Sequence, residues 1–223
     1  MFTFKRLALA AGAEALLSST VMADGLIVGF SQIGSESGGR AAETSVTKEQ
    51  ATTRGIDLKF ADAQQKQENQ IKAIRGFIAQ GVNAIMVAPV VATGWDEVLG
   101  EAKEANIPVI LLDRGVDASQ DLYLTSVASD QVHEGAVAGQ WLIDAVKDKD
   151  CKVVEIEGTV GSTPAINRKK GFDDAVLATK NITIIRSQTG EFPRSKGKEV
   201  MEGFIKAENG GKDICAVYAH NTT

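Results

Sequence analysis

Polar side chains that can make paired hydrogen bonds follow several apolar runs of this chain. They are Glu36, Ser37, Arg40, Asp113, Arg114, Arg168 and Asn221. Carboxylate, guanidinium and amide groups present two hydrogen-bonding atoms at a fixed spacing, which suits neighbouring hydroxyls of a polyol. Because acidic residues accompany the arginines, the set favours a neutral ligand rich in hydroxyls. Taken alone, Asp113 and Arg114 have another interpretation, a turn with a solvated ion pair.

Other chemistries find little support. The glycines between Gly34 and Gly39 do not match the dinucleotide pattern G-x-G-x-x-G, and Walker A and G-x-S-x-G sequences are absent. The two histidines, His133 and His220, lack metal-ligand spacing. Glu155 and Glu157 could form a carboxylate pair, although a solvated or edge-facing stretch explains them equally well. We therefore expect no catalysis, no cofactor and no metal site.

The scaffold expected to hold these residues is an α/β fold. Apolar strand-like runs alternate with amphipathic helical segments, which indicates parallel sheets covered on both faces. The expected strands are 26–30, 56–61, 84–90, 108–113, 122–127, 152–158, 182–188 and 214–220. The expected helices are one ending near 54 and the segments 67–80, 95–105, 131–146, 164–179 and 197–208.

Eight strands could form one sheet, but repeated loop lengths favour two Rossmann-like lobes, residues 24–127 and 128–223. In such sheets ligands bind beyond the carboxyl ends of the strands. The polar residues stand at those ends. The net charge of −5, with no basic cluster, disfavours a nucleic-acid partner.

The only two cysteines, Cys151 and Cys215, begin the first and third expected strands of the second lobe. In a sheet of order 2-1-3-4-5 these strands are neighbours, so both sulfurs lie at the same end. We predict a disulfide, which the chain-entropy model credits with about 4 kcal/mol. In a reducing compartment the alternative is a pair of buried thiols.

The first 23 residues have the pattern of a secretory signal. Lys5 and Arg6 precede the apolar stretch 7–17, and small residues lead to an expected cleavage site after Ala23. Glu14 interrupts the apolar stretch, and the alternative is a buried helix of the mature fold. We expect an exported, periplasmic protein.

The sequence closely resembles the ribose/galactose-binding family of periplasmic proteins, which serve sugar ABC importers. The match is specific because several long segments match in order between about Gly25 and Asn221. They are Val28–Thr44, Asp62–Arg75, Ala88–Trp95, Leu111–Arg114 and Arg194–Glu202. The resemblance implies the periplasmic binding protein type I fold, in which two lobes close on a sugar about a hinge.

By this resemblance the ligand is a monosaccharide, galactofuranose or a related sugar, and the protein is a monomer that delivers it to the permease subunits of an importer in the inner membrane. The implied ligand contacts are Glu36, Ser37, Gly38, Gly39, Arg40, Asp113, Arg114, Arg168 and Asn221. The resemblance also implies the Cys151–Cys215 bridge.

Two features depart from the family pattern. Gly39 stands where the family has Trp, and loss of an aromatic face should weaken sugar binding by about 1–2 kcal/mol. Relatives also continue well beyond Asn221, so we expect the second lobe to be partial.

Two other functions share this fold class. The effector-binding core of a sugar-responsive transcription regulator predicts a basic helix-turn-helix at the N-terminus, where this chain has an export pattern. An α/β enzyme acting on sugars predicts a base or nucleophile in the cleft, and none can be placed. The transport function is favoured over both.

Overall fold

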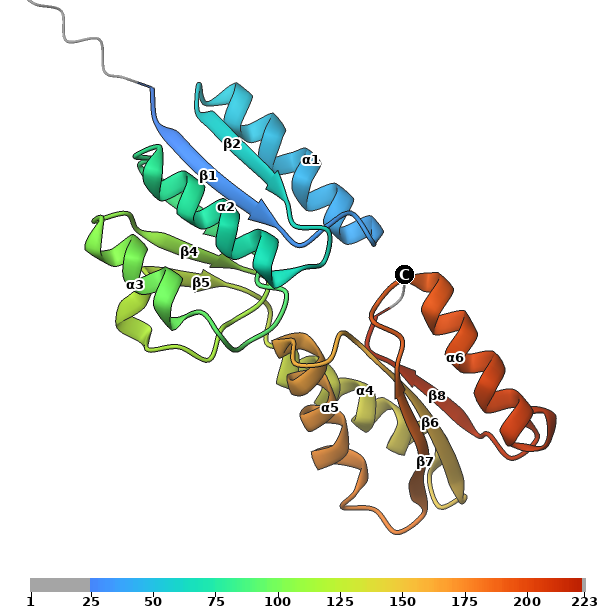
Figure 1. The fold of residues 1–223 in the computed structure, drawn as a ribbon. Coiled ribbons are helices and arrows are strands. Elements are labelled where there is room, and N and C mark those ends of the chain that lie inside the picture. The colour runs from blue at the N-terminus through green and yellow to red at the C-terminus, as the bar shows by residue number, and fades with distance from the viewer. Residues whose placement is uncertain (1–24, 222–223) are drawn as a thin grey trace, which may run out of the picture.

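The computed structural model describes residues 25–221. The expected export signal, residues 1–23, lies outside the described residues. Strands and helices alternate along the chain and form two groups, each built around a parallel sheet (Figure 1). Among the described helices, none is long and apolar enough to cross a bilayer.

The first group comprises β1 (Ile27–Gln32), α1 (Gly38–Thr53), β2 (Asp57–Asp62), α2 (Gln67–Ala79), β3 (Ala84–Val87), α3 (Asp96–Glu104), β4 (Val109–Leu112), the 3-10 turn η1 (Gln120–Leu122) and β5 (Thr125–Val127). The second comprises α4 (Gln131–Val146), β6 (Cys151–Glu157), α5 (Thr163–Val176), β7 (Ile182–Thr189), α6 (Arg194–Ala207), the 3-10 turn η2 (Asn209–Gly211) and β8 (Ala216–Ala219). We call them the first and second lobe.

Most of the expected elements agree with these bounds to within a few residues. Four strands are shorter than predicted, those expected over 84–90, 108–113, 122–127 and 214–220. The strand expected over 84–90 ends at Val87, because Pro89 has no N–H with which to continue the ladder. The stretch expected to be extended over 122–127 begins with the turn η1, and only Thr125–Val127 pairs with β4.

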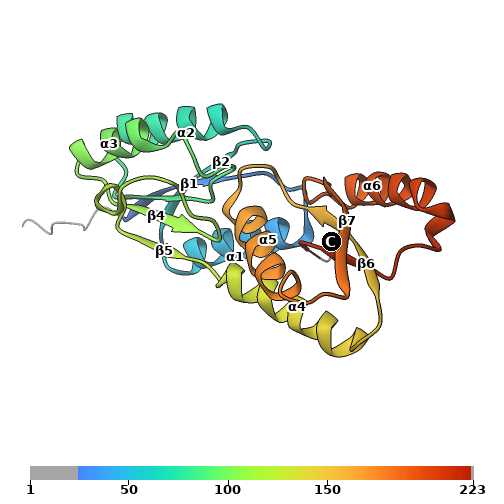
Figure 2. The same ribbon diagram turned by 90° about the horizontal axis from the view of Figure 1, so that it is seen from below.

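The first sheet has the order β2-β1-β3-β4-β5 and all its strands are parallel. Helices α2 and α3 cover one face and α1 covers the other, as the view in Figure 2 shows. The apolar side chains of α2 and α3 form one cluster with those of β3 and β4, including Ile74, Phe77, Leu99, Ile85 and Leu111. This burial supplies most of the cohesion of the lobe.

The second sheet has the order β7-β6-β8, again parallel. Phe172 and Val176 of α5 pack with Leu142 of α4 on one face. Val200 and Phe204 of α6 pack on the opposite face. The sheet therefore has helices on both faces, as its apolar strands predict, although Val217 of the edge strand β8 is 46% exposed.

The neighbouring strands β6 and β8 are joined by the Cys151–Cys215 disulfide, with the two Cα atoms 5.1 Å apart. Cys151 is the first residue of β6 and Cys215 directly precedes β8, so both lie at the amino ends of the strands, far from the loops at the carboxyl ends. The bond therefore supports the sheet without entering the region where the polar residues gather.

Hydrogen bonds connect the carboxyl-end loops of the two lobes. The Ala92 N–H donates to the Gly161 carbonyl at 2.8 Å, and the Gly115 N–H donates to the Thr163 hydroxyl at 2.9 Å. Gln131, at the start of α4, donates to the Asp113 carbonyl at 2.7 Å. The carboxyl ends of the two sheets consequently face each other across a shared cleft.

Candidate ligand-binding site

A cleft of about 310 Å³ lies between the two lobes at the carboxyl ends of their strands. Its size is at the lower end of the range for small-molecule sites, roughly 300–1,000 Å³. The lining residues come from both lobes. They are Glu36, Ser37, Gly39, Arg40, Glu43, Asp113, Arg114, Pro164, Arg168, Phe192 and Asn221.

Eight of the nine residues expected to contact a ligand line this cleft. The exception is Gly38, the first residue of α1, which is not part of the lining. The parallel topology explains this convergence, because residues up to 185 positions apart in sequence all follow carboxyl ends of strands. Whether they hold a ligand remains a prediction.

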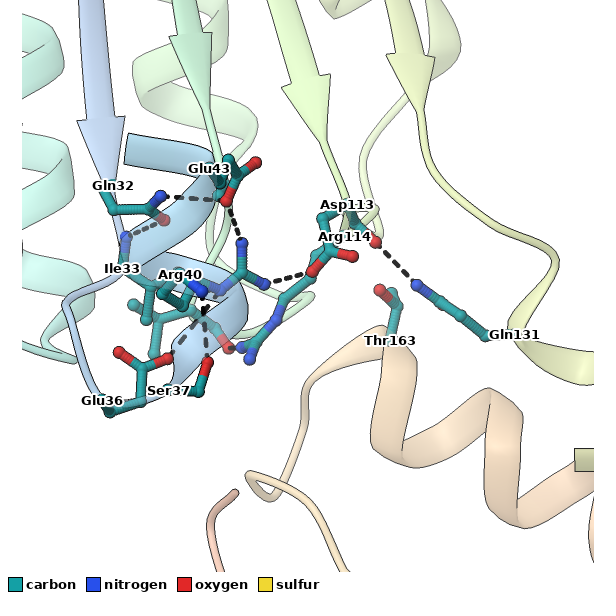
Figure 3. Close-up of polar contacts among 12 residues, drawn as sticks. Gln32, Ile33, Glu36, Ser37, Arg40, Glu43, Asp113, Arg114, Gln131 and Thr163 are labelled. Atoms are coloured by element: carbon teal, nitrogen blue, oxygen red, sulfur yellow. Dashed lines mark hydrogen bonds and ion pairs between the residues drawn. The ribbon is translucent and has the colours of Figure 1, made fainter. Parts of the chain in front are cut away.

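Arg40 is the centre of the polar contacts in the first lobe (Figure 3). One guanidinium nitrogen donates to Glu43 Oε2 at 2.6 Å and the other donates to Asp113 Oδ2. Glu36 Oε1 lies 3.9 Å from Arg40 Nε. Arg40 is only 7% exposed, so these carboxylates neutralise a largely buried cation.

Arg40 is placed by the start of α1 and by a second layer of contacts. Ser37 is the N-cap residue, and its hydroxyl accepts from the Arg40 N–H at 3.3 Å. The fully buried Gln32 donates to Glu43 Oε2 at 2.9 Å and accepts from the Ile33 N–H. The end of β1 therefore fixes Glu43, which in turn fixes Arg40.

Arg114 is more deeply buried than Arg40, with 3% exposure. It donates to the Val90 carbonyl at 2.9 Å, and its guanidinium lies over the Phe192 ring at 5.2 Å from the centroid. Burial, assisted by the nearby charge of Arg40, lowers the pKa of Arg114 to about 10, so the side chain remains a cation at neutral pH.

Two polar atoms of the cleft residues are buried with no hydrogen-bond partner among residues 25–221. They are Glu36 Oε2, an acceptor, and Arg114 Nε, a donor. A buried polar group without a partner costs about 1–3 kcal/mol, so a partner for either atom would stabilise the site. The first lobe therefore holds one unpaired acceptor and one unpaired donor on residues that line the cleft.

The second lobe contributes Arg168 and Asn221. Arg168 Nε donates to Glu134 Oε2 at 2.7 Å, and its carbonyl accepts from the Tyr218 hydroxyl at 3.1 Å. Burial acts to raise the pKa of Glu134, but hydrogen bonds from Ser129 and Arg168 outweigh it and lower that pKa overall. Arg168 thus enters the cleft already paired with a carboxylate.

Three lining residues were missed in the sequence: Glu43, Pro164 and Phe192. Phe192 follows β7, and the rule that ligands bind after carboxyl ends of strands would have identified its loop. Its φ of 74° is unusual for a residue with a side chain, which often marks a functional position. Glu43 is one helical turn from Arg40, a spacing that favours an ion pair.

The structure corrects one interpretation of the carboxylates on β6. Glu155 is fully buried rather than solvated, and it forms contacts with Lys169, Ser187 and His220. Glu157 shares Lys169 and Ser187 with Glu155, so the two glutamates are bridged by these side chains and do not form an open carboxylate pair. His133 is exposed near the start of α4. Within residues 25–221 no group of three or more His, Cys, Asp or Glu side chains is arranged to hold a metal ion.

Residues 28–223 match the model of the family described as "Periplasmic binding protein domain". The chain belongs to this family. Membership of this family confirms the predicted α/β fold class. Because the family consists of solute-binding proteins rather than enzymes, it also confirms the prediction that this chain is not an enzyme.

Individual relatives within the periplasmic binding protein family are similar over almost the whole chain. The galactofuranose-binding protein YtfQ of Escherichia coli is 61% identical over 98% of this chain and 69% of its own length. This close similarity confirms the resemblance seen in the sequence.

Comparison with solved structures shows the same similarity. The crystal structure of a galactofuranose-binding protein superposes with a TM-score of 0.86, at 64% identity, over 88% of this chain and 67% of that one. The binding protein of the arabinose ABC transporter from Shewanella sp. ANA-3, bound to α- and β-L-arabinofuranose, superposes with a TM-score of 0.83 at 58% identity. That match covers 87% of this chain and 64% of the other, so the chain spans about two thirds of the length of these relatives.

Proposed function

We propose that this protein captures a monosaccharide in its furanose form in the periplasm and delivers it, as a monomer, to the permease of an ABC importer. The relatives named above bind galactofuranose or arabinofuranose, which are five-membered rings carrying several hydroxyls. The proposed contacts are the eight expected residues that line the cleft, together with Phe192.

The observation that carries the proposal is the state of charge in the cleft. Arg40 is paired with Glu43 and Asp113, and Arg168 is paired with Glu134. The Arg114 cation is balanced by the nearby carboxylates of Asp113 and Glu36, so the cleft has little net charge with which to hold an ionic ligand. The two unpaired polar atoms, Glu36 Oε2 and Arg114 Nε, are one acceptor and one donor, and a sugar hydroxyl can be a partner for either kind.

Phe192 supplies an apolar surface beside these polar groups. Its ring faces the Arg114 guanidinium and lines the cleft. Sugar rings have an apolar face of C–H bonds that packs well on an aromatic ring. On the first lobe Gly39 leaves open space, since a Cβ added there would meet only Ser37 Oγ, at 3.9 Å.

Export to the periplasm is supported by two independent features. Residues 1–23 have the charge and apolar pattern of a signal peptide. The Cys151–Cys215 disulfide is typical of proteins that work in an oxidising compartment. Fractionation of cells expressing the full chain, with detection of cleavage after Ala23, tests this part of the proposal.

Calorimetry with ring-locked sugars tests the ligand. Methyl β-D-galactofuranoside should bind and methyl β-D-galactopyranoside should not, while L-arabinose and D-galactose should bind through their furanose forms. Arg114→Met should weaken binding at least tenfold, because a charged hydrogen-bond donor is lost. Arg75→Met, at an exposed ion pair on α2, should leave affinity unchanged.

Absence of binding by the folded protein would contradict the proposed function. Equal binding of the two galactosides would contradict the furanose form alone. Light scattering with and without sugar tests whether the protein is a monomer.

A further inference from the structure

His220 lies immediately before Asn221 at the end of β8 but is not part of the cleft lining. It is 4% exposed and is surrounded by polar contacts that the proposed sugar contacts do not include. We propose that His220, held as the neutral tautomer with its proton on Nε2, is a positioning residue for the wall of the cleft formed by Phe192 and Asn221. The inference rests on the proposed function of that cleft.

Both ring nitrogens of His220 have partners on β6 or directly after it. Nδ1 lies 3.2 Å from the backbone nitrogen of Gly158, and Nε2 lies 3.1 Å from Glu155 Oε1. The backbone N–H of His220 also donates to the Ile156 carbonyl at 3.1 Å. The ring therefore bridges the end of β8 to the turn that follows β6.

The chemistry of the two partners determines the tautomer. The Gly158 N–H can only donate, so Nδ1 must carry a lone pair. Burial acts to raise the pKa of Glu155, but hydrogen bonds from His220, Lys169 and Ser187 outweigh it and lower that pKa to about 2. Glu155 is thus a carboxylate that can only accept, and the single proton of the ring lies on Nε2.

Gly158 connects this arrangement to Phe192. A Cβ added at Gly158 would stand 2.0 Å from the tip of the Phe192 ring, so the ring rests directly on the bare Gly158 backbone. The peptide N–H held by His220 belongs to that same residue. A change in the Gly158 turn would therefore move the aromatic face that we propose packs on the sugar.

Asn221 directly follows His220 in the sequence. Its side-chain amide donates to the Phe192 carbonyl at 3.4 Å, so the two lining residues are also joined to each other. Fixing the His220 ring between Glu155 and Gly158 consequently limits the positions of both. His220 acts through these neighbours and does not need to touch the ligand.

Two substitutions separate the two hydrogen bonds. His220→Asn places an amide oxygen near the position of Nδ1, which keeps an acceptor for Gly158 but leaves Glu155 Oε1 without the donor at Nε2. His220→Gln places an amide nitrogen near the position of Nε2, which keeps the donor to Glu155 but removes the acceptor. If His220 acts by positioning, one variant should lose affinity for the sugar and the other should lose thermal stability.

With methyl β-D-galactofuranoside as the probe, His220→Gln should lose about tenfold in affinity while its melting temperature stays close to that of the wild type. His220→Asn should stay within about threefold in affinity but melt earlier, because a buried carboxylate oxygen has lost its partner. A merely structural role predicts instead that affinity falls in step with melting temperature in both variants, and that result would overturn the inference.

Nuclear magnetic resonance of the free protein gives a second test that does not depend on sugar. The chain has only two histidines, so ¹⁵N-histidine labelling without an affinity tag gives two sets of ring signals, and His133→Gln assigns them. The His220 signals should show a protonated Nε2 and an unprotonated Nδ1. In uniformly ¹⁵N-labelled protein, the Phe192 amide and Asn221 side-chain signals should shift in His220→Gln but not in His220→Asn.

A proton on Nδ1, or unchanged Phe192 and Asn221 signals in His220→Gln, would refute the positioning role. If the wild type binds no furanoside, the proposed function fails on its own, and these spectra still decide whether His220 places the two residues.

Discussion

Gly135 of α4 lies directly against the main chain of Arg168 in α5. A methyl group added at Gly135 would stand 2.1 Å from the Arg168 carbonyl oxygen. The contact is reciprocal, because a methyl group at Gly171 would stand 1.9 Å from the Val132 carbonyl oxygen. The two helices therefore cross at a separation that only glycine permits, and the residue held at this crossing is a proposed sugar contact.

Gly135→Ala should destabilise the protein by about 1–3 kcal/mol, because α4 and α5 must move apart to accept the methyl group. It should also weaken furanoside binding by displacing Arg168. The matched control is Gly203→Ala on α6, where an added Cβ meets no atom within 4 Å. That variant should gain up to about 1 kcal/mol from helix propensity. Urea unfolding measures the free energy of unfolding of both variants, and equal changes in the two would contradict the close crossing of α4 and α5.

Gly39→Trp should strengthen furanoside binding by about tenfold, corresponding to an aromatic contact of roughly 1–1.5 kcal/mol. The open space at Gly39 on the cleft wall allows the substitution. Gly39→Leu controls for bulk without an aromatic face and should gain less. Calorimetry checks the order of affinities, and weaker binding by the tryptophan variant would mean that the ring fills the ligand volume instead.

Reduction of the Cys151–Cys215 disulfide should lower the free energy of unfolding by about 4 kcal/mol, as the chain-entropy model gives for cysteines 64 residues apart. The double variant with alanine at both positions should show the lower stability with or without reductant. Urea unfolding with and without dithiothreitol makes the comparison. A wild type insensitive to reductant while its thiols titrate as free would contradict the bond.

Acid should destabilise the protein through Glu155. The pKa of this carboxyl is lowered from 4.5 to about 2 in the folded state, so its ionised form stabilises the fold above pH 4.5. That contribution, about 3 kcal/mol, is lost as the pH falls from 4.5 toward 2.

Urea midpoints measured across this range should fall less steeply for Glu155→Gln than for the wild type. Glu199→Gln, which changes an exposed carboxylate on α6, should keep the wild-type slope. Parallel curves for wild type and Glu155→Gln would show that Glu155 does not account for the acid sensitivity.

The strand order and most of the cleft lining could be derived from the sequence. Alternating apolar runs predict parallel strands, and the rule for their carboxyl ends selected Glu36, Arg40, Asp113 and Arg114. Gly38 was included with its neighbours, but as the first residue of α1 it is not part of the cleft lining. Position after a strand therefore identifies the loop, whereas the turn of the helix decides which residues line the cleft.

The sequence by itself determined the α/β class, the order of elements, the cysteine pairing and the family, because these follow from local periodicity and long matching segments. Only the tertiary structure decided that Glu155 is buried, that Phe192 lines the cleft, and that His220 bridges Glu155 and Gly158. Glu155 and His220 are 65 residues apart, and nothing local in the chain marks them as partners. Burial and hydrogen-bond geometry arise when distant segments pack, so they appear only once the sheet has formed.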